Sequence, residues 1–83
     1  MKKVVVYTIT PCPYCTSAKS LLTQRGIAFE EIWVDRNDDE KREALLARSG
    51  MRTFPQIFAG DQLIGGYEQL ADLDRQDQLK SLR

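Results

Sequence analysis

The sequence predicts an α/β fold in which a small mixed sheet carries helices on both faces. Alternating strand and helix patterns follow one another along the 83 residues, and strand–helix–strand units imply parallel pairing through right-handed crossovers. Two later strands joined by Gly60-Asp61 add an antiparallel hairpin. The expected order is therefore β-α-β-α-β-β-α. At this length we expect one domain, residues 1–83, with a modest core and a shallow surface site.

The first strand is expected at Val4–Thr8, where β-branched and aromatic residues form a near-continuous apolar run. Such a run is typical of a central strand that is buried on both faces. Pro13 suits the first turn of a helix, where its missing N–H costs nothing. The helix continues from Tyr14 and ends at Gly26, which suits a left-handed cap. Its apolar residues recur at spacings of three and four: Cys15, Ala18, Leu21 and Leu22.

A second strand is expected at Ala28–Val34, with Trp33 in the core because a single aromatic residue in a strand usually serves packing. The residues that follow predict a second helix over Glu40–Ser49, which Gly50 ends. Its apolar stripe consists of Ala44, Leu45 and Ala47.

The hairpin strands are expected at Phe54–Ala59 and Gln62–Ile64, and a short helix at Tyr67–Leu73. A polar tail follows, in which Leu79 and Leu82 are expected to pack.

Composition argues against two classes of partner. The 12 basic and 12 acidic residues balance, so no net charge draws the chain to nucleic acid or to an anionic membrane. No apolar run approaches the roughly 18–20 residues of a membrane span, and Val4–Tyr7 is too short for the core of a signal peptide. We therefore expect a cytoplasmic protein. A monomer is also expected, because the chemistry of its cysteine pair needs only one chain.

Two cysteines, separated by Pro13 and Tyr14, are the residues on which chemistry is expected. A bridge between Cys12 and Cys15 closes almost no loop, so it would be a poor structural staple but a suitable redox pair. A thiolate is the reactive species in disulfide exchange, and a helix N-terminus stabilises an anion. Cys12, at or near the N-cap, is therefore the expected nucleophile. Cys15 lies about one turn further on and is expected to resolve the mixed disulfide.

The cysteine pair has two alternative interpretations. Half a zinc site would need two more ligands, and the chain has no histidine and no further cysteine. Two inert buried cysteines are the second alternative, since free cysteine is often buried. The flanking prolines, however, place Cys12 in a loop between a strand and a helix, which is the context of a redox pair.

Three motifs together resemble those of a dithiol glutaredoxin of the bacterial type, and the resemblance runs from Val4 to about Leu73. Cys-Pro-Tyr-Cys at residues 12–15 is the first motif. Thr53-Phe54-Pro55 resembles that family's Thr-Val-Pro segment, and Gly65-Gly66-Tyr67-Glu68 resembles its Gly-Gly-x-Asp segment. The resemblance implies a thioredoxin-like fold and glutathione as co-substrate, with no bound cofactor and no metal. It further implies an enzyme that reduces protein disulfides and glutathionylated proteins.

The resemblance also implies where glutathione would bind. It places Pro55 after a cis peptide bond beside the cysteines, so that the backbone of Phe54 is free to pair with glutathione as an added strand would. The backbone N–H groups at Gly66, Tyr67 and Glu68 would receive the γ-glutamyl carboxylate.

The remaining contacts implied for glutathione come from other segments. Arg52, just before Thr53, would hold the glycine carboxylate of the tripeptide, and Tyr14 would line the groove. One departure concerns charge, because many family members carry a lysine where this chain has Ile9. A cation there would lower a thiol pKa, so its loss leaves more of that task to the helix N-terminus.

Two alternative functions remain open at this point. In the first alternative, the chain is a redoxin that is reduced by a flavin reductase and donates electrons to an enzyme such as ribonucleotide reductase. In the second, it is an iron–sulfur carrier, in which Cys12 of two chains and two glutathiones supply four thiolates. The Pro-Tyr pair between the cysteines disfavours this last interpretation.

Overall fold

Strand β1 (Val4–Thr8) lies inside a four-stranded sheet in the computed structural model, which describes residues 3–82. The sheet has the order β2-β1-β3-β4, with β2 at Glu30–Trp33, β3 at Gln56–Ala59 and β4 at Gln62–Gly65. β1 pairs in parallel with β2 and antiparallel with β3. The first strand–helix–strand unit therefore makes the parallel crossover that the sequence predicts. The second does not, because β3 enters on the far side of β1 and runs in the opposite direction.

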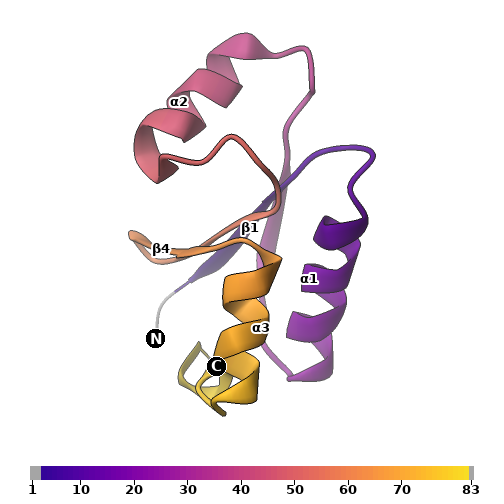
Figure 1. The fold of residues 1–83 in the computed structure, drawn as a ribbon, viewed down its shortest axis with the longest axis vertical. Coiled ribbons are helices and arrows are strands. Elements are labelled where there is room, and N and C mark those ends of the chain that lie inside the picture. Colours follow the sequence, from indigo (N-terminus) through magenta and orange to yellow (C-terminus); the bar gives the residue numbers. More distant parts are fainter. Residues whose placement is uncertain (1–2, 83) are drawn as a thin grey trace.

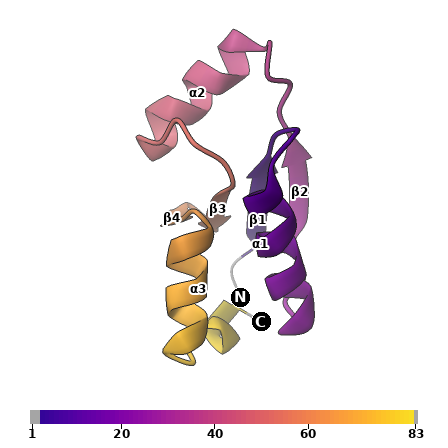
Figure 2. The same ribbon diagram turned by 45° about the vertical axis from the view of Figure 1, so that its right-hand side comes forward.

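Helices cover both faces of the sheet, as predicted (Figures 1 and 2). Helices α1 (Pro13–Gln24) and α3 (Tyr67–Arg75) lie side by side on one face. The Arg25 guanidinium, directly after α1, donates to both carboxylate oxygens of Asp74 in α3, at 2.6 and 3.0 Å. Hydrogen bonding from Arg25 lowers the pKa of Asp74, so this pair links the two helices at neutral pH.

The core lies between the sheet and the helices α1 and α3. Side chains alternate across a strand, so one face of β1 points Val4, Val6 and Thr8 into this layer, where all three are buried. The core residues are Val4, Val6, Ala18, Leu22, Ile27, Ile57, Leu70 and Leu79. Leu79 begins the short 3-10 helix η1 (Leu79–Leu82), and Leu82 packs against the same cluster, so both leucines of the tail pack as predicted.

Helix α2 (Asp39–Ser49) covers the opposite face, on its own (Figure 2). The Asp38 side chain caps it by accepting the N–H of Lys41 at 3.1 Å, and Gly50 ends it in the left-handed conformation at φ 71°. The Arg48 guanidinium of α2 lies 4.6 Å above the ring of Phe58 and donates to the hydroxyl of Tyr7 at 3.0 Å. None of the helices within residues 3–82 is long and apolar enough to span a membrane.

Two predictions about buried side chains are wrong. Only Leu45 of the expected α2 stripe is buried, while Ala44 and Ala47 are exposed, because one helix covers only part of this face. Trp33 is 53% exposed and lies outside the core. It sits at the end of the edge strand β2, where the indole reaches the segment before α1.

The strand and helix boundaries differ from the expected ones by a few residues. β2 is limited to Glu30–Trp33, and β3 begins only at Gln56 because Pro55 has no N–H to donate to a ladder. Helix α3 continues beyond Leu73 to Arg75.

Candidate functional site

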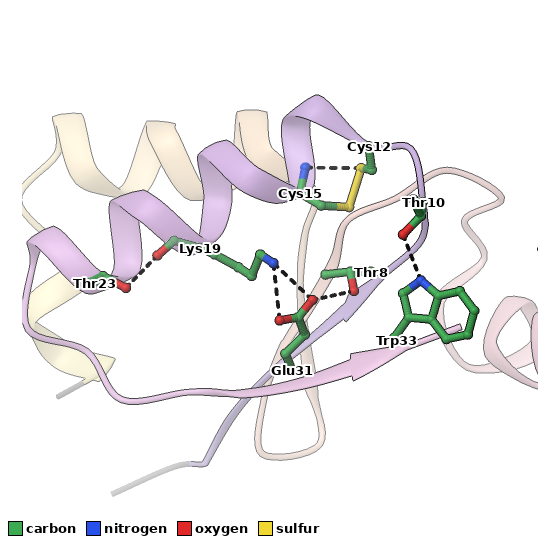
Figure 3. A network of polar contacts seen from close by, with 8 residues as sticks. All are labelled: Thr8, Thr10, Cys12, Cys15, Lys19, Thr23, Glu31 and Trp33. Atoms are coloured by element: carbon green, nitrogen blue, oxygen red, sulfur yellow. Dashed lines mark hydrogen bonds and ion pairs between the residues drawn. A yellow bond between two sulfur atoms is a disulfide. The ribbon is translucent and has the colours of Figure 1, made fainter. Parts of the chain in front are cut away.

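Cys12 and Cys15 are joined by a disulfide at the start of α1, with their Cα atoms 5.2 Å apart (Figure 3). Cys12 is the N-cap residue, and its sulfur accepts the backbone N–H of Cys15 at 3.1 Å. Pro13 occupies the first helical position, as its lack of an N–H predicts. Cys12 is half-buried, whereas Cys15 is only 3% exposed. The two sulfurs therefore differ in access, and the more accessible one lies at the positive end of the helix dipole.

The segment that leads from β1 to Cys12 is held by two side chains, one from the last residue of β2 and one from the connection that follows β2. The indole N–H of Trp33 donates to the Thr10 hydroxyl at 2.9 Å (Figure 3). The Arg36 guanidinium donates to the carbonyl oxygens of Thr10 and Pro11, at 3.2 and 3.4 Å. The backbone that leads into Cys12 is thus held from outside the helix that carries this cysteine.

An acidic group lies beneath α1 in a small polar network (Figure 3). The Glu31 carboxylate accepts the hydroxyl of Thr8 at 2.8 Å and the ammonium of Lys19 at 3.0 and 3.2 Å. Hydrogen bonding, first from Thr8 and then from Lys19, lowers the pKa of Glu31. Glu31 is therefore ionised at neutral pH and ties β2 to α1.

A groove of about 460 Å³ lies next to the cysteine pair. Three chain segments that are far apart in the sequence line it: the Cys12–Cys15 turn, the segment before β3 and the start of α3. Its lining residues are Tyr14, Met51, Thr53, Phe54, Pro55, Gly66, Tyr67, Glu68 and Gln69. The rings of Tyr14 and Tyr67 stack with their centroids 6.0 Å apart and form one side of the groove.

One wall of the groove offers unpaired backbone groups. The bond between Phe54 and Pro55 is cis, as predicted. Among the described residues, none hydrogen-bonds the backbone N–H or carbonyl of Phe54. The buried amide of Gln56 supports this wall from behind, because its Nε2 donates to the carbonyls of Met51 and Thr53, each at 3.0 Å. An extended ligand can pair with Phe54 as a further strand would.

The opposite end of the groove is formed by the N-terminus of α3. Gly66 is the N-cap residue, and its N–H donates to the Gln69 side chain at 2.9 Å. Gly65 has φ 126°, a conformation that L side chains rarely adopt. A Cβ on Gly65 would lie 2.8 Å from Cγ of Gln69, so only glycine fits there. The next N–H groups, of Tyr67 and Glu68, begin the helix and point out of its end, where an anion is favoured.

Nearly all of the residues expected to bind a ligand are brought together in this groove. Arg52 is the exception, because it lines a neighbouring cavity of about 190 Å³ that also borders Phe54. The sequence reasoning missed Met51 and Gln69. Gln69 follows Gly66 by three residues, and this capping-box spacing is a signal that would have found it. Met51 carries no such signal.

Comparison with known proteins relates the chain to one family over most of its length. The family model described as Glutaredoxin matches residues 4–64. A probable glutaredoxin of Synechocystis sp. is 49% identical over 81 residues, which cover 96% of this chain and 73% of the relative. Glutaredoxin 3 of Escherichia coli strain K12 is 45% identical over 82 residues, which cover 99% of this chain and 98% of the relative.

Solved structures give the same result for the fold. A buckwheat glutaredoxin–glutathione complex superposes with a TM-score of 0.86 at 32% identity, covering 98% of this chain and 76% of that one. The solution structure of a glutaredoxin from Brucella melitensis superposes with a TM-score of 0.84 at 43% identity, covering 99% of this chain and 88% of that one. The thioredoxin-like arrangement implied by the sequence motifs is thus confirmed.

Proposed function

Because the chain belongs to the glutaredoxin family and is a thiol–disulfide oxidoreductase, we propose that glutathione supplies its electrons and that Cys12 is its nucleophile. The observation that carries the proposal is the position of Cys12 at the N-cap of α1, next to a groove with unpaired backbone groups. Its targets would be glutathionylated proteins and protein disulfides.

Removal of glutathione from a protein uses Cys12 alone. The Cys12 thiolate attacks the glutathione sulfur of the mixed disulfide, and the protein leaves as a thiolate. A second glutathione thiolate then attacks the glutathione now bound to Cys12. This step releases oxidised glutathione and restores the Cys12 thiolate. In the net reaction one disulfide is exchanged for another: the incoming glutathione thiol is oxidised, and the sulfur of the target protein is reduced to a thiol.

Reduction of a protein disulfide uses both cysteines. Cys12 attacks one sulfur of the target and forms a mixed disulfide with it. Cys15 then attacks the sulfur of Cys12, which releases the target as a dithiol and closes the Cys12–Cys15 bond. The 5.2 Å separation of the two Cα atoms is compatible with that bond. Two glutathiones return the pair to its reduced form.

The groove accounts for the choice of glutathione as the reductant. Phe54 would pair its backbone with the cysteine residue of the tripeptide, beside Thr53 and Pro55. The γ-glutamyl carboxylate would lie at the N–H groups of Tyr67 and Glu68, next to Gly66. Tyr14 would cover the ligand, and Arg52 would reach the glycine carboxylate from the adjacent cavity. The buckwheat neighbour is itself described as a glutathione complex.

We extend the proposal to the setting in which the chain works. Residues 1–83 would act as one domain, since α1, α3, η1 and the sheet share one core. The chain would act as a monomer, because it carries both cysteines itself. A cytoplasmic location, where the glutathione pool keeps thiols reduced, would suit this chemistry.

The test is the turnover of a glutathione mixed disulfide, coupled through glutathione reductase to the oxidation of NADPH. We expect turnover by the native chain and loss of that turnover in Cys12→Ser. The matched assay replaces glutathione and its reductase with a thioredoxin reductase. Activity only in the second assay would overturn the assignment of glutathione as the electron donor.

A further inference from the structure

Arg36 lies in the short connection between β2 and α2, outside the groove and outside the cysteine turn. Its guanidinium nevertheless reaches the segment directly before the nucleophile, where it donates from Nε to the carbonyl of Thr10 and from Nη2 to that of Pro11. Pro11 is bonded directly to Cys12. A cation is thus anchored by hydrogen bonds to the two residues that directly precede Cys12.

The connection that carries Arg36 is itself held in place. The carbonyl of Arg36 accepts a hydrogen bond from the guanidinium of Arg42 in α2, at 3.2 Å. The N–H of Asn37 donates to the Asp35 carboxylate at 2.9 Å, and the N–H of Asp38 donates to the Asp35 carbonyl at 3.0 Å. Because the backbone on both sides of Arg36 is held, the exposed side chain starts from a fixed point, and its two hydrogen bonds must order only the side chain itself.

The charge of Arg36 is not cancelled by an ion pair. Within residues 3–82, no carboxylate oxygen lies within 4.0 Å of its guanidinium, whereas the neighbouring Arg42 approaches Asp39 at 3.9 Å. The two carbonyls that Arg36 contacts carry partial negative charge, which disfavours a nearby thiolate. A guanidinium on those carbonyls offsets their field and adds its own attraction to the anion.

We propose that Arg36 is a positioning residue that fixes the segment before Cys12 and stabilises the Cys12 thiolate. The proposal rests on the assignment of Cys12 as the nucleophile. Arg36 acts through the carbonyls of Thr10 and Pro11 and does not touch the substrate. The positive charge that the sequence lacks at Ile9 is then supplied from a different segment of the chain.

Other ionisable groups meet at the same end of the sheet, and the test must separate them from Arg36. Cys15 and Tyr14 lie on α1, and Tyr67 and Glu68 lie at the start of α3. Asp35 and Asp38 flank Arg36 in its own connection, and the paired Arg42 and Asp39 follow in α2. Glu31 on β2 is paired with Lys19, so these two charges offset each other. Replacing Cys15 removes the second thiol, and the remaining groups are the same in all variants compared.

The experiment measures the rate at which iodoacetamide alkylates Cys12 in reduced Cys15→Ser protein, as a function of pH. Three further proteins carry Arg36→Gln, Arg36→Lys or Arg75→Gln in this background. Arg75 is an exposed arginine at the far end of α3, so its replacement removes the same net charge away from the cysteine. Arg36→Gln is expected to move the midpoint of the profile upward by about 0.5–1 pH unit. Arg36→Lys is expected to restore at least half of that shift, and Arg75→Gln to cause none.

Salt provides a second readout, because the difference between Arg36→Gln and its parent should shrink when the ionic strength is raised to about 1 M. An unchanged midpoint in Arg36→Gln, or an equal shift in Arg36→Lys, would overturn the role of Arg36. A parent protein whose Cys12 titrates as an ordinary thiol, near pH 8.5, would instead overturn the assignment of the nucleophile. The two failures are therefore distinguishable.

Discussion

The indole N–H of Trp33 donates a hydrogen bond at 2.9 Å to the hydroxyl of Thr10, which lies two residues before Cys12 of the disulfide (Figure 3). Trp33 is the single tryptophan of the chain. Its emission should therefore report the state of the cysteine pair. We expect the intensity to rise when the Cys12–Cys15 bond is reduced, because a nearby disulfide quenches indole emission.

The measurement is a fluorescence titration of the native chain with glutathione redox buffers. The control carries both Cys12→Ser and Cys15→Ser, so it can form neither the internal bond nor a mixed disulfide with glutathione, and it should show no redox-dependent step. An emission that is identical in the oxidised and reduced native chain would contradict the placement of Trp33 beside this segment.

The Glu31 network should make stability depend on pH in a defined direction. The pKa of Glu31 is lowered in the folded chain by hydrogen bonds, first from Thr8 and then from Lys19. A lowered folded-state pKa gives stability that is present above the unfolded value, near 4.3, and that disappears as pH falls through the folded value. Glu31→Gln should therefore lower the free energy of unfolding at pH 7 by about 1 kcal/mol or less, since the pair is half-exposed.

Denaturant unfolding at a series of pH values tests this expectation. The stabilities of the native chain and Glu31→Gln should converge below the folded-state pKa of Glu31. A difference that stays constant down to the most acidic pH would show that the side chain contributes by packing and not by its charge.

Replacing Gly65 or Gly66, which are adjacent at the end of the groove, with alanine should change the stability of the fold by different amounts. Gly65→Ala would place an L side chain at φ 126° and against Gln69. We therefore expect the free energy of unfolding to fall by about 1–3 kcal/mol. A Cβ on Gly66 meets its neighbours only at ordinary contact distances of 3.5 Å or more, so Gly66→Ala should cost under about 1 kcal/mol. Thermal unfolding of both variants gives the comparison, and equal losses would contradict the geometry at Gly65.

Buried Gln56 should affect glutathione use without touching the ligand. Gln56→Leu would leave the carbonyls of Met51 and Thr53 without their donor, and the wall that presents Phe54 would loosen. We expect a loss of stability of about 1–3 kcal/mol and a several-fold rise in the KM for glutathione, with a smaller change in kcat. Gln24→Leu, an exposed change on α1, is the matched control. A KM for Gln56→Leu equal to that of the control would contradict the supporting role.

Local signals account for what could be predicted from the sequence. Pro13 and Gly26 mark the two ends of α1, and the spacing of its cysteines places Cys12 at the cap, so both the helix and the redox pair follow from neighbouring residues. The groove, by contrast, could be predicted only through the family resemblance. Its three walls are far apart in the sequence, and no spacing rule connects Tyr14 with Tyr67.

The failures share a different cause, which is tertiary context. Trp33 resembles a core residue in a strand, but β2 is an edge strand and the indole has a hydrogen-bond partner in another segment. The direction of β3 depends on the side of β1 on which it enters the sheet, and the pattern of strands and helices does not encode that choice. Arg36 looks like a solvated loop residue until the fold places it on the carbonyls before Cys12.

The central claim is that the two cysteines have different tasks, and peptide mapping by mass spectrometry tests it most directly. Reduced Cys15→Ser and Cys12→Ser proteins are each mixed with oxidised glutathione, and the attached glutathione is followed over time. We predict rapid and stable attachment at Cys12 in the first protein. Attachment at Cys15 in the second should be slow, because that sulfur is buried and lies behind the helix cap. Equal rates at the two cysteines, or a faster reaction at Cys15, would contradict the account.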